Sequence, residues 1–406
     1  MIETAKGLPA ADSLDSLRLA RASLLEGELV TPVLTIDEPA LRRNIAEMAG
    51  FLAPLGVELA PHVKTHMSPE IWKLQEEAGA SCCTVATVAQ ALVFVAAGAR
   101  RILLASEVVA EGDLRALALA VLAHPGLDVT VFCDSVRGVV ALDRALTKAG
   151  GGASLHAVVD VGVPGWRTGC RTLGDALEVA HAITGSAHLT LVGTAGYEGV
   201  LWSLTEGRDT AVTDYLRLAT TVHLALFDAG MLPAAPMLSF GGSDLYPAVL
   251  EHVLPVARAT GSSLLLRSGC YLFHDHGKYE RAQNEVASSR GKPRFEPAIA
   301  VWAPIVSAPE PHLAVAGLGR RDAGHDAGLP QPLRRYRDRE LSPVTGAASR
   351  SIYDQHLVVD DPHGCLEVGD LVEFGISHPC TTLDRWHRAI LVDGLAPTGV
   401  VELAFP

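Results

Sequence analysis

A predicted strand is followed directly by a candidate reactive lysine in the stretch Val57-Glu58-Leu59-Ala60-Pro61-His62-Val63-Lys64-Thr65-His66. Its first four residues form an apolar run that predicts a strand, and Lys64 follows where that strand ends. Ser68 is a helix-capping type and Pro69 suits a first helical turn. A lysine in this place lies at the edge of a parallel sheet, where loops build active sites, and its amine can attack a carbonyl cofactor. Most lysines are solvated surface charges, so the rest of the chain must support this interpretation.

The same strand-to-helix order recurs along the chain and predicts the fold. Eight apolar runs, most of them followed by a helical pattern, occupy 57–60, 81–86, 101–105, 128–133, 154–161, 188–194, 236–240 and 263–267. Eight such strands within about 230 residues are what a (β/α)8 barrel requires. A doubly wound sheet is the alternative, because periodicity does not reveal whether a sheet closes.

The pattern changes after about residue 280 and predicts a second domain. Short apolar runs broken by Gly and Pro occupy 298–306, 312–316, 356–359, 370–374 and 388–392. We therefore expect an α/β barrel over 37–280 and an antiparallel β domain over 281–406, which an N-terminal strand at 25–36 joins. Segment 283–297 and the basic stretch 334–339 are predicted to be loops, as is the Gly-rich polar segment 319–330.

The composition excludes several classes of protein. The 406 residues carry a formal net charge of −13, which argues against general binding to a phosphate backbone. No apolar run approaches the roughly 20 residues of a membrane span. The first 25 residues lack a secretory pattern, and seven cysteines without regular spacing suit reduced thiols. We expect a cytoplasmic protein.

Unusual residues gather where the predicted barrel strands end. Asp160 and Arg167 follow one strand, Gly196-Tyr197-Glu198-Gly199 ends another, and Gly241-Gly242-Ser243 and Gly269-Cys270-Tyr271 follow the last two. Glycines admit a phosphate to the backbone, although tight turns are also Gly-rich. With Lys64, these turns suggest a phosphorylated aldehyde cofactor, pyridoxal phosphate (PLP), bound through the lysine as a Schiff base.

These motifs resemble the D-serine dehydratase and D-threonine aldolase family. The resemblance rests on Pro61-His62-Val63-Lys64-Thr65-His66, Gly196-Tyr197-Glu198-Gly199, Phe240-Gly241-Gly242-Ser243 and Gly269-Cys270-Tyr271 and extends from about Thr31 to the end of the chain. It implies the alanine-racemase fold, also called fold type III of PLP enzymes. It also implies an active site in a head-to-tail homodimer that takes a small D-amino acid. Within the family, insertions at 284–293 and 334–346 are similar to a bacterial subgroup named amino acid deaminases.

His378-Pro379-Cys380 is a candidate metal motif. Imidazole and thiolate suit zinc, and on a strand one intervening residue places both side chains on the same face. Alternatively, this is a strand end with a buried cysteine and a surface histidine. The family resemblance favours zinc on His378 and Cys380, because D-serine dehydratase-like members carry His-x-Cys. The D-threonine aldolases carry an acidic second residue, which suits a harder ion such as manganese.

The resemblance also implies roles for single residues. Lys64 would hold PLP and remove the Cα proton, and Tyr197 would position the cofactor ring or relay a proton. His62 would contact the cofactor or tune the lysine, and Arg167 would lie near the cofactor. The phosphate would bind to Gly241, Gly242, Ser243, Gly269, Cys270 and Tyr271.

Other clusters compete for these roles. His274-Asp275-His276 has close ligand spacing, but it directly follows a barrel strand and can simply shape a loop. Cys82-Cys83 is interpreted as core. Val200 stands after Gly199 where many relatives have histidine, and Cys270 stands where threonine is more usual.

Three functions therefore remain open. The first is a PLP- and zinc-dependent dehydratase of D-serine or another β-hydroxy D-amino acid, which gives a 2-keto acid and ammonia. The second is a D-threonine aldolase-type lyase, which gives glycine and an aldehyde. The third is a non-catalytic PLP-binding barrel protein, a class that normally lacks a C-terminal β domain.

Overall fold

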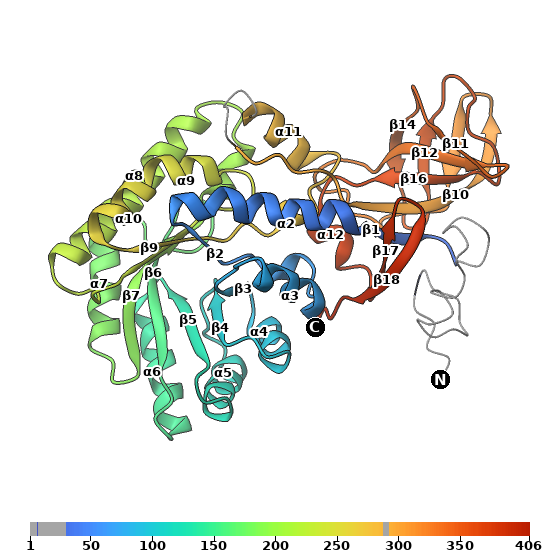
Figure 1. Cartoon of the computed structure of the whole chain (residues 1–406). Coiled ribbons are helices and arrows are strands. Elements are labelled where there is room, and N and C mark those ends of the chain that lie inside the picture. Colours follow the sequence, from blue (N-terminus) through green and yellow to red (C-terminus); the bar gives the residue numbers. More distant parts are fainter. Residues whose placement is uncertain (1–5, 7–29, 287–291) are drawn as a thin grey trace. The chain divides into compact units, whose positions relative to one another are not determined.

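The computed structural model describes residue 6 and residues 30–286 and 292–406 (Figure 1). The chain divides into two compact units, each built from separate segments. The barrel unit comprises Ala49–Lys64 and Gln75–Gly269 together with Pro406. The β unit comprises the described part of Met1–Met48, Thr65–Leu74 and Cys270–Phe405.

Eight parallel strands form the sheet of the barrel unit, in the order β2-β9-β8-β7-β6-β5-β4-β3. Backbone bonds join its two ends: Ser81 N–H donates to Leu59 O (2.9 Å) and Thr84 N–H to Pro61 O (3.0 Å). The sheet therefore closes, which confirms the predicted barrel. The strands are β2 (Glu58–Leu59), β3 (Cys83–Val85), β4 (Arg101–Leu104), β5 (Asp128–Cys133), β6 (Leu155–Val161), β7 (Leu189–Gly196), β8 (Met237–Phe240) and β9 (Ser263–Leu266).

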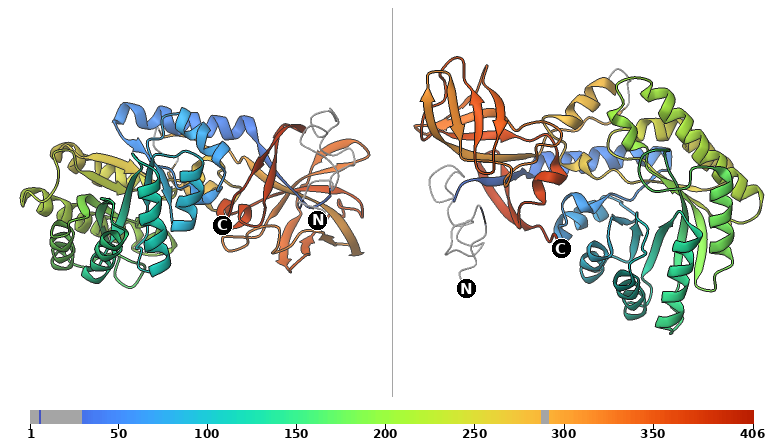
Figure 2. Two further views of the ribbon diagram at one scale, coloured as in Figure 1. Left: turned by 90° about the horizontal axis from the view of Figure 1, so that it is seen from below. Right: turned by 180° about the vertical axis from the view of Figure 1, so that it is seen from behind.

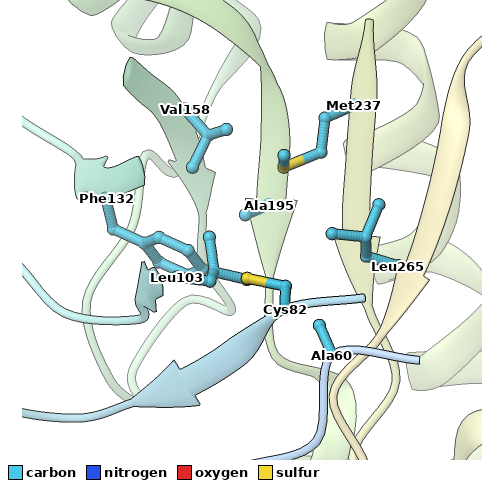
Figure 3. Packing of buried hydrophobic residues seen from close by; sticks show 8 residues of the cluster. All are labelled: Ala60, Cys82, Leu103, Phe132, Val158, Ala195, Met237 and Leu265. Carbon is cyan, nitrogen blue, oxygen red and sulfur yellow. The ribbon is translucent and has the colours of Figure 1, made fainter. Parts of the chain in front are cut away.

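One side chain from each strand region fills the barrel interior (Figure 3). This buried set consists of Ala60, Cys82, Leu103, Phe132, Val158, Ala195, Met237 and Leu265. Because all eight are at most 8% exposed, the barrel is a packed core and not a pore. Cys82 is part of that core, as the sequence predicts.

The helices of the barrel unit cover the outer face of its sheet (Figure 2). The helical segment that follows β8 consists of two helices, which meet at Val253. Pro255 has no N–H to continue the first helix, so α9 ends and α10 begins. The helices that lie entirely in the barrel unit are α4 (Val88–Ala96), α5 (Glu111–Ala123), α6 (Val136–Ala149), α7 (Leu173–Thr184), α8 (Arg208–Asp228), α9 (Tyr246–His252) and α10 (Leu254–Thr260). Most residues of α2 (Glu38–Leu52) and α3 (Pro69–Glu77) belong to the β unit. Within the described residues, no helix combines the length and apolarity that crossing a membrane requires.

The β unit is built on a sheet with the strand order β13-β12-β16-β10-β1-β17-β18, to which β11, β14 and β15 attach. β1 pairs antiparallel with β10 and parallel with β17, so the N-terminal strand belongs to the C-terminal sheet (Figure 1). Residues 25–29 of the strand predicted at 25–36 lie outside the described residues. The strands are β1 (Val33–Asp37), β10 (Ile299–Glu310), β11 (Leu313–Ala316), β12 (Gln331–Arg337), β13 (Glu340–Pro343), β14 (Ala348–Ile352), β15 (Leu357–Asp360), β16 (Leu371–Gly375), β17 (Arg388–Asp393) and β18 (Ala396–Glu402).

Among the loop predictions in this unit, the one for 334–339 is wrong over most of its length, and the one for 283–297 is wrong over its first four residues. Most of 334–339 belongs to β12, where Arg334 lies opposite Glu373 on β16. Its guanidinium donates to both Glu373 carboxylate oxygens, at 2.5 and 2.9 Å. A cross-strand partner thus neutralises a charge that disfavours a strand in isolation. Segment 283–297 also begins inside a helix, α11 (Lys278–Val286).

Candidate functional site

Lys64 lies in η2 (Val63–Thr65), a single 3-10 turn directly after β2. The approach to this turn is fixed from β3, because Thr84 Oγ1 donates to Ala60 O (2.6 Å) and Thr84 N–H to Pro61 O. Among the described residues, no carboxylate lies within ion-pair distance of the Lys64 amine. The barrel thus holds the amine beyond the carboxyl end of its first strand, where the sequence predicts it.

His62 lies two residues before Lys64 and forms the bridge to Thr84. Burial lowers the pKa of His62 well below its usual value, and the charges of Lys64, Arg267 and Arg167 lower it further. The imidazole is therefore neutral at physiological pH. Its Nδ1 is buried and has no hydrogen-bond partner among the described residues. A buried polar atom of this kind normally has a hydrogen-bond partner, which here can be a bound ligand or a water molecule.

The glycine turn after β8 is held by a carboxylate. Glu198 accepts the N–H groups of Gly241 (3.1 Å) and Gly242 (2.6 Å). Burial raises the pKa of Glu198, and these two bonds oppose that rise. The two amides predicted to bind phosphate are thus engaged by Glu198, so their contribution here is to set the shape of the turn. Nearby, Gly269 N–H donates to Ser243 Oγ at 3.2 Å.

Tyr197 packs against this turn. A Cβ atom on Gly242 would lie 2.6 Å from Tyr197 Cε2, so the ring can occupy its place only because residue 242 has no side chain. The Arg167 guanidinium lies 5.3 Å from the centre of the Tyr197 ring, within cation–π range. The structure therefore brings Tyr197, Arg167 and Gly242 into one group within the barrel unit.

Three buried or half-buried ionisable groups near the barrel mouth were missed by the sequence analysis or left without a role. Arg267 is 5% exposed and donates to Ser239 O (2.6 Å) and to Gly196 O. Asp160 accepts from Thr168 Oγ1 (3.1 Å), and burial and the neighbouring Glu107 raise its pKa well above the usual range. Burial likewise raises the pKa of Glu107. Both acids therefore favour the protonated form more than an exposed carboxyl group does. Only the place of Asp160 near the end of β6 and of Glu107 after β4 could have signalled the pair.

The candidate metal ligands lie in the β unit, but not on a strand as predicted. His378 is the N-cap of α12 (Pro379–Leu383), and Cys380 lies in the first turn of that helix. Pro379 occupies a first-turn position, where its missing N–H costs nothing. The argument from strand alternation is therefore wrong, and a helix start sets the spacing of the two side chains.

Asp326 is a candidate site residue that the sequence analysis did not single out. Its Oδ2 lies 2.6 Å from His378 Nδ1, and its Oδ1 accepts from Thr381 Oγ1 at 2.6 Å. Although burial opposes them, these two bonds lower the pKa of Asp326. A carboxylate on Nδ1 leaves Nε2 as the ligating atom and orients the ring, as for metal-bound histidines generally. The polar composition of 319–330 was the only feature of the sequence that could have drawn attention to Asp326.

Cys270 and Tyr271 follow the barrel unit in the chain and belong to the β unit. Cys270 Sγ lies 3.4 Å from Cys380 Sγ. The Tyr271 ring meets Phe295 edge-on, with 5.8 Å between ring centres. These contacts therefore tie both residues to the β unit, and their role toward a phosphate stays a prediction.

The rival cluster His274-Asp275-His276 has structural partners. His274 Nε2 lies 2.9 Å from Glu280 Oε2, and Asp275 accepts the N–H groups of Gly277 and Tyr279 at the start of α11. Within 30–286 and 292–406, no three or more His, Cys, Asp or Glu side chains converge on one metal position. His378 and Cys380 therefore remain a two-residue candidate, which leaves coordination positions for water or substrate.

Both implied groups fit the residues present. For PLP, the barrel unit offers an unpaired lysine amine, an unpartnered buried His62 nitrogen and a turn that any Cβ on Gly242 would obstruct. For a metal, the β unit offers an imidazole already oriented by a carboxylate and a thiol two residues further on.

Comparison with known proteins gives two family matches. Residues 36–247 match the model of the alanine racemase N-terminal domain, and residues 298–392 match a putative serine dehydratase domain. The chain is 27% identical over 388 residues to a 3-hydroxy-D-aspartate aldolase of Paracoccus denitrificans, which covers 94% of this chain and 92% of that protein.

Two solved structures have the same fold. The D-threonine aldolase of Filomicrobium marinum superposes with a TM-score of 0.77 at 24% identity, covering 93% of this chain and 95% of the other. The D-threo-3-hydroxyaspartate dehydratase of Delftia sp. HT23 gives 0.70 at 23% identity, covering 93% and 98%. Variants of that dehydratase with a cysteine or a histidine replaced by alanine are also similar, the cysteine variant in a metal-free form.

Proposed function

We propose a reaction for this chain on the premise that it belongs to the alanine racemase N-terminal-domain family, within the D-serine dehydratase and D-threonine aldolase group of fold type III PLP enzymes. It is therefore a PLP-dependent lyase. The proposed reaction is a zinc-assisted dehydration and deamination of D-serine or another β-hydroxy D-amino acid. The products are a 2-keto acid and ammonia.

The barrel unit supplies the groups for the first half of the reaction. PLP, when bound through Lys64, withdraws electron density from the substrate Cα. Once the substrate amine has replaced it on the cofactor, the Lys64 amine would be free to accept the Cα proton. Neutral His62 offers its unpartnered Nδ1 as a hydrogen-bonding group, and it adds no positive charge beside the lysine. The Arg167–Tyr197 pair would orient the ring, and Tyr197 would also relay a proton.

The β unit supplies the groups for the second half. His378 Nε2 and Cys380 Sγ would hold the metal, with Asp326 fixing the imidazole. A bound zinc ion is a Lewis acid that helps a β-hydroxyl group to leave. The single observation that carries the dehydratase assignment is the thiol of Cys380 two residues after the carboxylate-oriented His378. The dehydratase variants named above, whose replaced histidine and cysteine are also two positions apart, support the same assignment.

The aldolase reaction is the second candidate, because two similar proteins carry aldolase names: 3-hydroxy-D-aspartate aldolase and D-threonine aldolase. It would use the same lysine and the same metal but break the Cα–Cβ bond. By contrast, the non-catalytic alternative normally lacks a β domain, whereas here residues 298–392 match a serine dehydratase domain. We also propose that the chain acts as a homodimer, which the family resemblance supports.

Product analysis tests the proposal. Purified protein loaded with PLP and zinc is incubated with D-serine, D-threonine, D-3-hydroxyaspartate and their L-forms, with and without a chelator. Chelator-sensitive ammonia and keto acid from D-forms are expected. Glycine and an aldehyde would instead assign the aldolase reaction.

A variant pair locates the metal. Cys380→Ala should abolish turnover and leave PLP bound, whereas Cys365→Ser, which changes a thiol elsewhere in the β unit, should leave turnover unchanged. Unaltered turnover in Cys380→Ala would refute the role of the thiol.

A further inference from the structure

Two thiols of the β unit lie in contact. Cys270 is in η4 (Cys270–Leu272), Cys380 is in α12, and their Sγ atoms are 3.4 Å apart across 110 positions of sequence. Thr65 Oγ1 lies beside both sulfurs, at 3.3 Å from Cys380 and 3.8 Å from Cys270. None of the seven cysteines forms a disulfide in this structure. The contact is therefore between two reduced sulfurs.

The other thiols that lie near polar groups face oxygen atoms instead. Cys170 Sγ contacts Asp134 O at 3.5 Å, and Cys365 Sγ contacts Asp361 Oδ1 at 3.1 Å. Cys82 Sγ contacts Cys83 O at 3.9 Å. None of these arrangements places a second sulfur where a bond could form, so the 270–380 contact differs from them in kind.

We propose that Cys270 and Cys380 form a reversible disulfide under peroxide, and that this bond removes the sulfur on which metal binding depends. A disulfide requires an S–S distance of about 2.0 Å, so the two sulfurs must approach by roughly 1.4 Å. Side-chain rotation supplies a movement of this size. Cys270 is 4% exposed and Cys380 is half-buried, so peroxide reaches Cys380 first.

The reaction is balanced with hydrogen peroxide as the oxidant. The sulfur of Cys380 attacks one peroxide oxygen, the O–O bond breaks, and a sulfenic acid and one water form. Cys270 sulfur then attacks the Cys380 sulfur, the S–O bond breaks, and the second water leaves. Two thiols are oxidised and one peroxide is reduced. A thiol reductant reverses the bond by exchange.

The consequence for the metal rests on the proposed function. A disulfide sulfur is no longer a thiolate ligand, so zinc and peroxide compete for Cys380. Zinc at ten times its dissociation constant leaves about one-tenth of the sites unbound, so it should slow oxidation about tenfold.

The test uses the full-length, PLP-loaded protein after metal removal. A stoichiometric amount of hydrogen peroxide is added, remaining thiols are alkylated under denaturing conditions, and the digest is analysed by mass spectrometry. We expect a linked peptide pair containing Cys270 and Cys380, reversed by dithiothreitol. Oxidation of Cys380 to sulfenic or sulfinic acid without that pair would overturn the proposal.

Two variants and one addition sharpen the result. Cys270→Thr should lose the linked pair, whereas Cys365→Ser should retain it. A repeat with zinc separates the two hypotheses. If zinc slows formation of the disulfide, zinc and peroxide compete for Cys380. If the rate is unchanged, the competition and the role of Cys380 as a zinc ligand are both refuted, but the disulfide between Cys270 and Cys380 is still established.

Discussion

Three carboxyl groups near the mouth of the barrel unit occupy an environment opposite to that of three carboxyl groups in the β unit. In the barrel unit, burial raises the pKa of Asp160, Glu107 and Glu198, and their partners are backbone amides, a hydroxyl or another carboxyl. In the β unit, Glu373 and Asp370 pair with arginines of β12, and Asp326 pairs with His378. Asp275 is the exception there, since burial raises its pKa to about 6.

This difference indicates which ionisable groups contribute to stability and which are candidates for a role in the reaction. Ion pairs between neighbouring strands stabilise a fold, and they hold arginines that would otherwise disfavour β12. Buried acids without full neutralisation destabilise a fold at neutral pH and are typical of reaction sites. We therefore expect substitutions at the barrel mouth to change chemistry and substitutions on β12 and β16 to change stability.

Lys64→Ala should give the largest effect. Loss of the amine removes both the covalent attachment of PLP and the base, so turnover of D-amino acids should fall by about 10²–10⁴-fold or more. The 3-10 turn should persist, so the free energy of unfolding should hardly change. Initial rates and the absorbance of bound PLP check the prediction. Lys73→Ala, on the exposed face of α3, is the control. A large loss of stability in Lys64→Ala would contradict the expectation that substitutions at the barrel mouth change chemistry rather than stability.

Asp370→Ala should destabilise the β unit. The carboxylate is buried, accepts two bonds from Arg337 at 2.6 Å, and accepts the Glu367 N–H at 2.8 Å. Removing it leaves a half-buried guanidinium underpaired, at a cost of about 2–4 kcal/mol. Urea unfolding followed by tryptophan fluorescence measures the loss. Asp393→Ala at the exposed end of β17 should cost little, and equal losses in both variants would contradict the assigned role of the ion pair.

Asp326→Asn should weaken metal binding. An amide cannot orient the His378 ring as a carboxylate does, so affinity for zinc should fall about 10–100-fold. Competition with a chromophoric chelator gives the dissociation constant without any assay of turnover. Asp384→Asn, whose carboxylate bonds to the neighbouring Arg385, is the matched control. Unchanged zinc affinity in Asp326→Asn would remove the positioning role.

Glu107→Gln should have the smallest effect, and its sign depends on pH. The folded protein binds a proton on the Glu107–Asp160 pair that the unfolded chain has already released above about pH 4–5. Stability from this pair therefore falls as pH rises through the raised pKa values. An amide donates a permanent N–H to Asp160, so the variant should gain about 1 kcal/mol at pH 8 and little at pH 5. Thermal unfolding at pH 8 and pH 5 measures the difference in stability between the variant and the unchanged protein. A gain in stability at pH 5 alone would contradict the raised pKa values of the pair.

Local sequence patterns predicted most of the barrel, because each strand and helix there is set by its own apolar periodicity. The strand Asp128–Cys133 agrees with its predicted bounds to the residue. The sequence missed β12 because its arginines become compatible with a strand only when β16 lies beside them. The residues of the candidate site likewise fall into those that local sequence predicts and those that it does not. Lys64 was found from local context, whereas Asp326 was missed because it lies 52 positions from the histidine that it orients.

The parallel pairing of β1 with β17 sets an order of events during synthesis. β1 ends at Asp37, but its partners begin at Ile299 and Arg388. At about 5–20 residues per second, they leave the ribosome on the order of tens of seconds after β1 does. The barrel unit ends at Gly269, apart from Pro406, and its eight strands emerge before any partner of β1. The strand made first is thus among the last to find its place, and its apolar residues Val33, Leu34 and Ile36 stay unpaired throughout that interval.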